Sequence, residues 1–182
     1  LIKIHGTPMI EVVVNNLRPS TNYQFIFLVL EEHLKSLDVL NLLKEIEPNC
    51  VVIPVEEVTE GAACTVLLAK NEINNKENLM IANSDQFIDY DINQYLALHN
   101  QDFDGFIMTM KAEEDKWSYI GFDERGLVER VVEKEVISDE ATVGIYNFKH
   151  GSDFVLAAEE MIEKELRVNG EFYVAPVYNE LI

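Results

Sequence analysis

The feature that most constrains the fold is a nearly continuous apolar, aromatic-rich run, Tyr23–Leu30 (YQFIFLVL). Strands that are covered on both faces of a sheet have this pattern. Two shorter runs, Val51–Val55 and Leu79–Ala82, have the same character. Helical patterns separate the three runs. The chain therefore predicts repeated strand–helix–strand units, which join parallel strands through right-handed crossovers.

Apolar residues at helical spacing predict the helices between these strands. Thr7 is expected to cap the first helix, with Pro8 at its first position. The apolar face of this helix consists of Ile10, Val13, Val14 and Leu17. A second helix is predicted from Leu34, Leu37, Leu40 and Leu43, and two more at Gly61–Lys70 and Ile92–Leu98.

The rhythm changes after about residue 104, where strand patterns follow one another directly. The predicted elements are strands at Phe106–Met110, Trp117–Phe122, Leu127–Glu133 and Thr142–Phe148, followed by an amphipathic helix at Phe154–Leu166. We therefore predict an α/β fold with a mostly parallel central sheet flanked by helices and a small antiparallel extension. A single domain is expected over residues 1–182.

The composition narrows the classes of partner. Fourteen basic residues face 33 acidic ones, a net charge of −19, which argues against nucleic acid or an anionic membrane as the partner. A small phosphate ligand needs only one or two local cations and stays open. No apolar run approaches the ~20 residues of a membrane span. We expect a cytoplasmic protein with reduced, buried thiols at Cys50 and Cys64.

Three places could carry chemistry because they follow predicted strands. The first is Asn83-Ser84-Asp85-Gln86, where the Asp85 carboxylate could hold Mg²⁺ against a phosphate, or merely begin a turn or cap the next helix. The second is Thr59–Ala63, where small residues would let a ring or phosphate approach the backbone, unless Gly61 only makes a turn. The third is Lys134, either a phosphate-binding point charge or a solvated surface lysine.

The short motif Asp89-Tyr90-Asp91 has two interpretations. It has the DxD form that metal-dependent glycosyltransferases use. Asp91 also stands directly before a predicted helix, where it would act as the N-cap. We favour the cap, because such matches arise by chance in an acidic chain. The four histidines (His5, His33, His99 and His150) form no metal-ligand pattern.

Taken in order, these pieces resemble the nucleotidyltransferases that make NDP-sugars and related activated metabolites, such as glucose-1-phosphate thymidylyltransferases and phosphocholine cytidylyltransferases. The resemblance covers essentially the whole chain. The segments that carry it are Leu1-Ile2-Lys3-Ile4 with Gly6–Ile10, Glu60–Ala63, Asn83–Gln86, Glu133-Lys134, Ala141–Tyr146 and Gly170-Glu171-Phe172.

The resemblance implies a role for each of several residues. Asp85 would bind Mg²⁺, Lys134 would contact the phosphate of the acceptor, and Glu171 would hydrogen-bond the acceptor. The other residues in implied binding positions are Glu60, Gly61 and Ala62 for the nucleotide, and Asn83 and Gly144 for the acceptor. The implied substrates are an NTP (CTP, dTTP or UTP) and a small phosphorylated acceptor, and the product would serve surface polysaccharide or glycoconjugate synthesis. A homo-oligomer is compatible with the family.

Several departures from the family pattern qualify these expectations. Glu135 replaces the proline that usually follows the lysine. Residues 1–182 lack the family's first strand, its glycine-rich loop with an arginine, and its last segment, so we expect a domain truncated at both ends that binds NTP poorly. Two alternatives remain: a glycosyltransferase of the same fold that uses Asp89 and Asp91, and a non-catalytic subunit of that fold.

Overall fold

The computed structural model describes residues 2–98 and 103–182, so His99 lies outside the described residues. The chain forms two compact units, each made of two separate stretches of sequence. The first unit comprises Leu1–Val58 and Asn83–Gln101, and the second comprises Thr59–Ala82 and Asp102–Ile182. A single domain over residues 1–182 stays a prediction.

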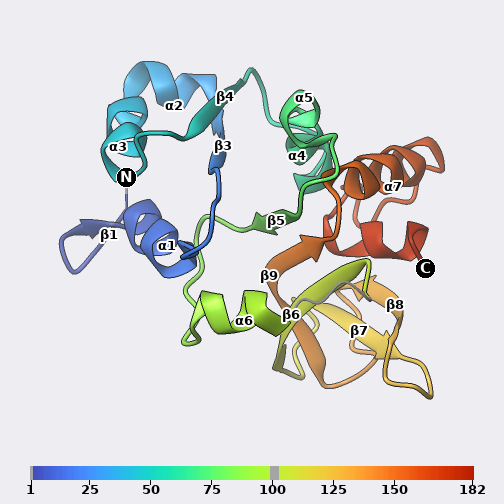
Figure 1. The fold of residues 1–182 in the computed structure, drawn as a ribbon. Helices are drawn as coiled ribbons and strands as arrows, with labels where there is room; N and C mark the ends of the chain where they lie inside the picture. The colour runs from blue at the N-terminus through green and yellow to red at the C-terminus, as the bar shows by residue number, and fades with distance from the viewer. Residues whose placement is uncertain (1, 99–102) are drawn as a thin grey trace. The chain divides into compact units, whose positions relative to one another are not determined.

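The first unit carries a short parallel sheet and four helices (Figure 1). Its elements are β1 (Lys3–Ile4), β2 (Thr7–Pro8), α1 (Met9–Leu17), β3 (Ile26–Leu30), α2 (Glu31–Ser36), α3 (Val39–Ile46), β4 (Val51–Val55) and α6 (Ile92–Leu98). β3 and β4 pair parallel, with Ile26 opposite Val51 and Leu30 opposite Val55. A cluster of Val39, Leu43 and buried Cys50 packs against the partly buried Phe25 and Phe27, which explains why this stretch of sequence is aromatic-rich.

Two predictions for the first unit are wrong in detail. Thr7 does not cap α1: it pairs with Ile4 in a small antiparallel ladder, and Pro8 takes the N-cap position without a side-chain hydrogen bond. The leucine stripe is divided between α2 and α3, because the backbone leaves helical geometry at Leu37, where φ is −124° and ψ is 149°. As a result Leu43 is buried, whereas Leu40 is 45% exposed.

The second unit is built on a five-stranded antiparallel sheet. Its elements are α4 (Ala62–Leu67), α5 (Lys70–Ile73), β5 (Leu79–Ala82), β6 (Gly105–Lys111), β7 (Ser118–Phe122), β8 (Val128–Glu133), β9 (Glu140–Phe148), α7 (Gly151–Glu163) and the 3₁₀ helix η1 (Ala175–Glu180). The strand order is β5-β9-β7-β8, and β6 also pairs with β9. β9 is thus the strand that joins the others.

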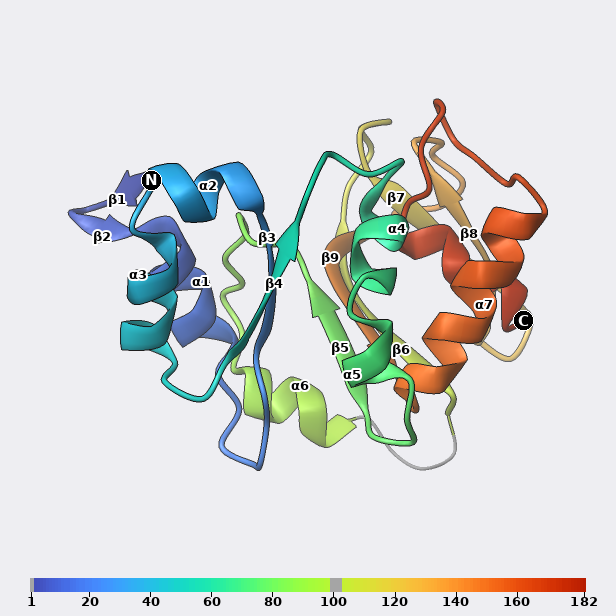
Figure 2. The same ribbon diagram turned by 90° about the horizontal axis from the view of Figure 1, so that it is seen from above.

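Helices α4, α5 and α7 lie side by side in the second unit (Figure 2). Beneath α7, the fully buried ring of Phe148 stacks on Tyr178, with 4.5 Å between ring centroids, and meets Phe154 edge-on at 5.2 Å. Burying aromatic rings of this size supplies much of the apolar stabilisation of a core. The aromatic cluster therefore joins β9, α7 and η1.

The α/β class predicted from the sequence is confirmed, with helices around a central sheet and an antiparallel portion. The pairing of the strands differs from the expectation of a mostly parallel sheet. Parallel pairing is present between β3 and β4, whereas β5, which we expected to pair parallel, runs antiparallel to β9 with Ala82 opposite Ile145. Among the described residues, no helix has both the length and the apolar character needed to cross a membrane.

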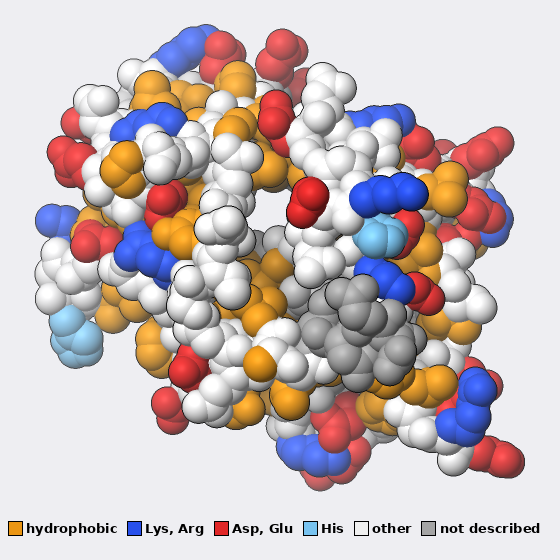
Figure 3. Space-filling view, viewed as in Figure 1, with side chains coloured by type: hydrophobic (Ala, Val, Ile, Leu, Met, Phe, Trp, Pro, Cys, Tyr) orange, Lys and Arg blue, Asp and Glu red, His pale blue; other side chains and the backbone are white. Residues whose placement is uncertain are grey.

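Basic side chains on the surface are scattered among acidic ones (Figure 3). Several make ion pairs, such as Lys111 with Asp139 at 2.7 Å and Lys164 with Glu160 at 2.7 Å. These ion pairs neutralise both lysines locally.

Candidate functional site

The predicted site residues are divided between the two units. Asn83 and Asp85 belong to the first unit, and the second unit contains Glu60, Gly61, Ala62, Lys134, Gly144 and Glu171. Within the second unit, one short segment, residues 167–173, contacts both the Glu60–Gly61 loop and Lys134. The structure therefore brings Glu60, Gly61, Lys134 and Glu171 together around this segment.

Residues 167–172 form a tight hairpin, called here the NG hairpin. The backbones of Val168 and Glu171 exchange two hydrogen bonds, each 3.0 Å long. The two residues at its tip, Asn169 and Gly170, have positive φ angles of 50° and 84°. A two-residue hairpin turn needs positive φ at both central positions, and Asn-Gly is the sequence that adopts it most readily. The exposed Glu171 is therefore placed by a rigid turn.

The Glu60–Gly61 loop packs directly against the NG hairpin. The N–H of Phe172 donates to the carbonyl of Glu60 at 2.9 Å, and the N–H of Ala63 donates to the carbonyl of Phe172 at 3.0 Å. Gly61 has φ +135°, and a Cβ atom there would lie 2.4 Å from the Phe172 carbonyl oxygen. We expected a glycine here so that a ligand could approach, and the structure shows that the neighbouring backbone already requires it.

The start of α4 has one backbone donor already in use. The N–H of Ala63 is used by Phe172, and Thr65 donates its N–H to the carbonyl of Gly61 at 3.1 Å. Ala62 is exposed, as a ligand-lining position requires. The side chain of Thr59 donates to the same Gly61 carbonyl at 2.9 Å and so stiffens the turn before the helix.

Lys134 follows the last residue of β8, as predicted, and its backbone is in the left-handed region with φ 58°. Its N–H donates to the carbonyl of Trp117 at 2.9 Å, which fixes the backbone at the end of β8. The side chain is exposed, and its Nζ donates to the hydroxyl of Tyr173 at 2.7 Å while lying 4.8 Å from the centre of the same ring. No carboxylate in residues 2–98 and 103–182 forms an ion pair with Lys134.

The surroundings keep Lys134 charged. The hydrogen bond to Tyr173 raises the pKa of its ammonium group, and the negative charges of Glu133 and Glu171 act in the same direction. An exposed ammonium that is held by a neutral hydroxyl retains its charge for an anionic ligand. A solvated lysine is also charged at neutral pH, so the phosphate contact and the surface lysine both stay predictions for Lys134.

Glu133, next to Lys134, is a buried carboxyl group with 8% exposure. Burial raises its pKa, and the nearby Glu171 adds to this, whereas the hydrogen bond from Ser118 and the charge of Lys134 lower it. The carboxyl group is thus tied to β7 through the hydroxyl of Ser118. Loss of solvation is the largest of these effects, so protonated Glu133 is favoured relative to a free glutamate.

Gly144 lies in a bulge of β9 and has φ +78°. Against β6, the register moves from Ile107 opposite Tyr146 to Thr109 opposite Thr142, so β9 has extra residues at this point. Bulges of this kind redirect the backbone, and a residue with positive φ inside a strand favours glycine. Gly144 is buried and lies beside Ile145, which pairs with Ala82 at the end of β5.

Asn83 and Asp85 follow β5 directly, as predicted, and both are exposed. Asp85 lies in a turn with Ser84, so the turn expected as the alternative is present. The segment is anchored a few residues later, where the side-chain amide of Asn16 exchanges two 2.9 Å hydrogen bonds with the backbone of Ile88. Gln86 has a buried Nε2 atom with no hydrogen-bond partner among the described residues.

Asp91 is a helix cap, as we favoured. Its Oδ1 accepts hydrogen bonds from the backbone N–H of Asn93 at 2.8 Å and from the side-chain amide of Asn93 at 3.1 Å, and α6 begins at the next residue. A carboxylate oxygen that accepts from the first turn of a helix is occupied by a structural task. This finding weakens the glycosyltransferase alternative, which needs Asp91 for a metal ion.

The carboxylates of the described residues do not gather into a preformed metal cluster. No three His, Cys, Asp or Glu side chains of residues 2–98 and 103–182 are placed to hold an ion together. Mg²⁺ in phosphate-transfer sites is bound by one or two carboxylates, with substrate oxygens and water completing the shell. The exposed Asp85 carboxylate fits this mode. Cys50 and Cys64 are both free thiols, and Cys64 is only partly buried.

Comparison with known proteins decides the family. The sequence profile described as "Nucleotidyl transferase" matches residues 1–172. The chain belongs to the nucleotidyl transferase family. The resemblance noted from the ordered motifs is thereby confirmed. Enzymes of this family generally use divalent metal ions.

Solved structures agree with this assignment. A nucleoside-diphosphate-sugar pyrophosphorylase from Vibrio cholerae RC9 is similar with a TM-score of 0.76 and 25% identity, over 99% of this chain and 77% of that chain. Two more distant proteins share the fold. These are a UDP-glucose pyrophosphorylase complexed with UDP-glucose (TM-score 0.72, 15% identity, 96% and 75% coverage) and the inositol-1-phosphate CTP transferase from T. maritima (TM-score 0.75, 13% identity, 98% and 70% coverage).

Arg167 and Tyr173 organise the part of the site that belongs to the second unit, and sequence reasoning missed Arg167. Arg167 was not singled out, although it stands three residues before Gly170 of a recognised motif. The hydroxyl of Tyr173 holds Lys134. The available signal was the Asn169-Gly170 pair, which predicts a tight hairpin and therefore places its flanking residues together.

Proposed function

We propose that the protein transfers a nucleotidyl group from CTP, dTTP or UTP to a small phosphorylated acceptor, such as a sugar 1-phosphate or phosphocholine. The observation that carries this proposal is the exposed ammonium of Lys134, held 2.7 Å from the Tyr173 hydroxyl and beside Glu171 rather than neutralised in an ion pair. Membership of the nucleotidyl transferase family supports the reaction class. The product would be an activated precursor for polysaccharide or glycoconjugate synthesis.

The proposed reaction is an in-line displacement at the α-phosphorus of the NTP. An oxygen of the acceptor's phosphate forms the new bond to that phosphorus. The bond between the α-phosphorus and the oxygen that bridges to the β-phosphorus breaks, and this oxygen leaves with pyrophosphate. The chain needs to supply position and charge neutralisation, since no group on the protein becomes covalently attached.

Each residue has a role in the proposal. Lys134 binds the phosphate of the acceptor as a point charge, and Glu171 accepts a hydrogen bond from the acceptor. Glu60, Gly61 and Ala62 bind the nucleotide, and Gly144, itself buried, permits the bulge in β9 that borders the acceptor. Asn83 contributes to acceptor binding. Asp85 would ligate Mg²⁺, which when bound neutralises phosphate charge.

Pyrophosphate release by the full-length protein tests the proposal. The protein would receive CTP, dTTP or UTP with Mg²⁺ and either glucose 1-phosphate or phosphocholine. We expect release with one NTP–acceptor pair, and its loss in Asp85→Asn. Asp89→Asn is the matched control, since Asp89 is also an exposed aspartate of the same segment, and it should retain activity. Equal activity in Asp85→Asn and Asp89→Asn would remove Asp85 from the metal site.

A further inference from the structure

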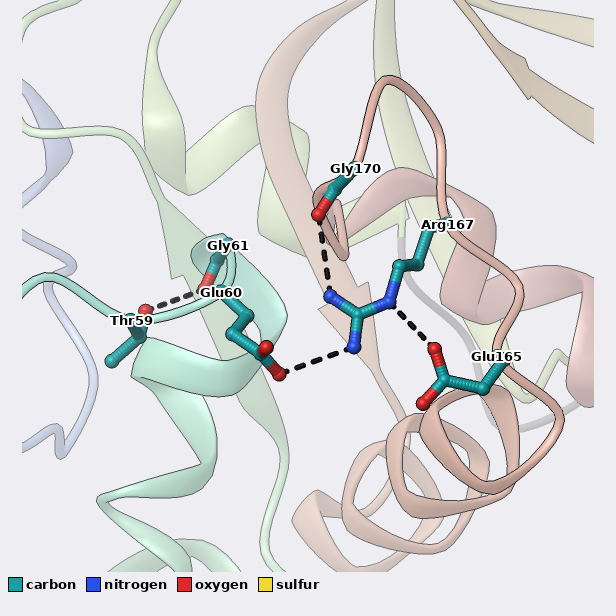
Figure 4. A network of polar contacts seen from close by, with 6 residues as sticks. All are labelled: Thr59, Glu60, Gly61, Glu165, Arg167 and Gly170. Atoms are coloured by element: carbon teal, nitrogen blue, oxygen red, sulfur yellow. Dashed lines mark hydrogen bonds and ion pairs between the residues drawn. The ribbon is translucent and has the colours of Figure 1, made fainter.

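The strongest unassigned feature of the second unit is the set of contacts made by Arg167. Its three guanidinium nitrogens each have a different partner (Figure 4). Nη2 lies 3.2 Å from Oε2 of Glu60, Nε donates to Glu165 at 2.6 Å, and Nη1 donates to the carbonyl of Gly170 at 3.3 Å. Arginine suits this position because its planar group presents donors in fixed, divergent directions, which lysine cannot do.

An aromatic ring supports the guanidinium as well. The Cζ atom of Arg167 lies 4.1 Å from the centre of the Phe172 ring, and Phe172 is fully buried. A cation over an aromatic face is attracted by the ring quadrupole and is fixed in orientation. Arg167 is therefore anchored to the NG hairpin, and its ion pair with Glu60 reaches a loop more than 100 residues earlier in the chain.

We propose that Arg167 is a positioning residue for nucleotide binding: it clamps the Glu60–Gly61 loop to the NG hairpin and neutralises the charge of Glu60 where the NTP binds. The inference rests on the proposed function, which assigns this loop to the nucleotide. The Glu60 side chain is 67% exposed, so its carboxylate is open to a ligand. Without Arg167, an anionic triphosphate would meet an unpaired carboxylate on a looser loop.

The contacts separate this role from a purely structural one. Backbone hydrogen bonds from Phe172 to Glu60 and from Ala63 to Phe172 hold the loop to the hairpin without Arg167. The ion pair itself is partly exposed, with Arg167 at 28% and Glu60 at 67%, and pairs open to solvent contribute little to global stability. Loss of Arg167 should consequently leave the fold intact and act on the exact position and charge of Glu60. The effect should appear in the KM for the NTP and not in kcat, as for a contact made equally in the ground and transition states.

The test uses Arg167→Met in the full-length protein, which keeps the length of the side chain and removes its charge. With the NTP–acceptor pair that the unsubstituted protein uses, we expect the KM for the NTP to rise about tenfold with kcat nearly unchanged. Arg125→Met is the matched control, because Arg125 makes a similar exposed ion pair with Asp123 at 2.9 Å in the turn between β7 and β8. An unchanged KM in Arg167→Met would overturn the inference.

Two further measurements decide the mechanism. In a double-mutant cycle with Glu60→Gln, the double variant should have a KM no higher than Arg167→Met alone, whereas independent effects would contradict a clamp. Hydrogen exchange needs no activity: the amides of Ala63 and Phe172 should exchange faster in Arg167→Met, and unchanged exchange would refute the clamp. Silence of the unsubstituted protein with every substrate pair would overturn the proposed function instead, and exchange alone would then decide the clamp.

Discussion

Gly61→Ala is the substitution whose cost can be worked out most fully from the structure. Gly61 has φ 135° and ψ 171°, a backbone region that only glycine adopts readily, and a side chain there costs about 1–3 kcal/mol. The new Cβ would lie 2.4 Å from the Phe172 oxygen and 2.5 Å from its nitrogen, so the loop must move off the NG hairpin. Movement would weaken the hydrogen bonds Phe172–Glu60 and Ala63–Phe172, each contributing about 0.5–1.5 kcal/mol.

Together these terms predict that Gly61→Ala lowers the free energy of unfolding by roughly 2–6 kcal/mol. Gly126→Ala is the matched control: its φ is +77°, but no atom lies within 4 Å of the added Cβ, so only the backbone cost of about 1–2 kcal/mol applies. Urea unfolding followed by circular dichroism gives both values under the same conditions. If the two variants lose the same stability, the close packing of the loop on the hairpin is not what requires glycine.

Three other predictions concern single residues. Asp91→Ala should cost about 1 kcal/mol through loss of the α6 cap and leave pyrophosphate release unchanged; loss of that release in a folded variant would contradict a purely structural role for Asp91. Tyr173→Phe should lower the pKa of Lys134, since their hydrogen bond is the largest cause of its elevation, and an NMR titration showing no decrease would contradict this contact. Because burial raises the folded-state pKa of Glu133 above its ordinary 4.5, its contribution to stability is fully present below pH 4.5 and is lost as the pH rises through the raised value. Urea unfolding should therefore show that Glu133→Gln becomes more stable relative to the unsubstituted protein as the pH rises from 4.5 through the raised pKa. If the free energies of unfolding of the two proteins change with pH in parallel, this prediction is wrong.

The sequence was most informative where a pattern depends on neighbours in the chain. Apolar runs predicted β4 and β5 with their observed bounds, and the pattern at Ile92–Leu98 predicted α6. The Asp91 cap could be predicted because the capping partner is only two residues away. Local spacing also placed Asp85 after β5 and Lys134 after β8, so their positions followed from where strands end.

The sequence was least informative where distant segments compete for the same groups. The side chain of Thr7 could cap a helix, but Thr7 instead pairs with Ile4 in an antiparallel ladder. The direction of β5 depends on β9, more than 60 residues later, and no local pattern reports it. Gly61 suggested a ligand-binding turn because its contact with Phe172 cannot be read from spacing. The Arg167 clamp was missed for the same reason, since Glu60 lies far from it in the chain.

The most direct test of the proposed nucleotidyl transfer follows the phosphorus atoms themselves. The full-length protein would be incubated with Mg²⁺, its acceptor and an NTP labelled either at the α- or at the γ-phosphate. The account predicts that the α-label appears in a product joined to the acceptor and that the γ-label leaves in pyrophosphate, with both events lost in Lys134→Ala. Transfer of the γ-label to the acceptor, or release of inorganic phosphate alone, would contradict nucleotidyl transfer.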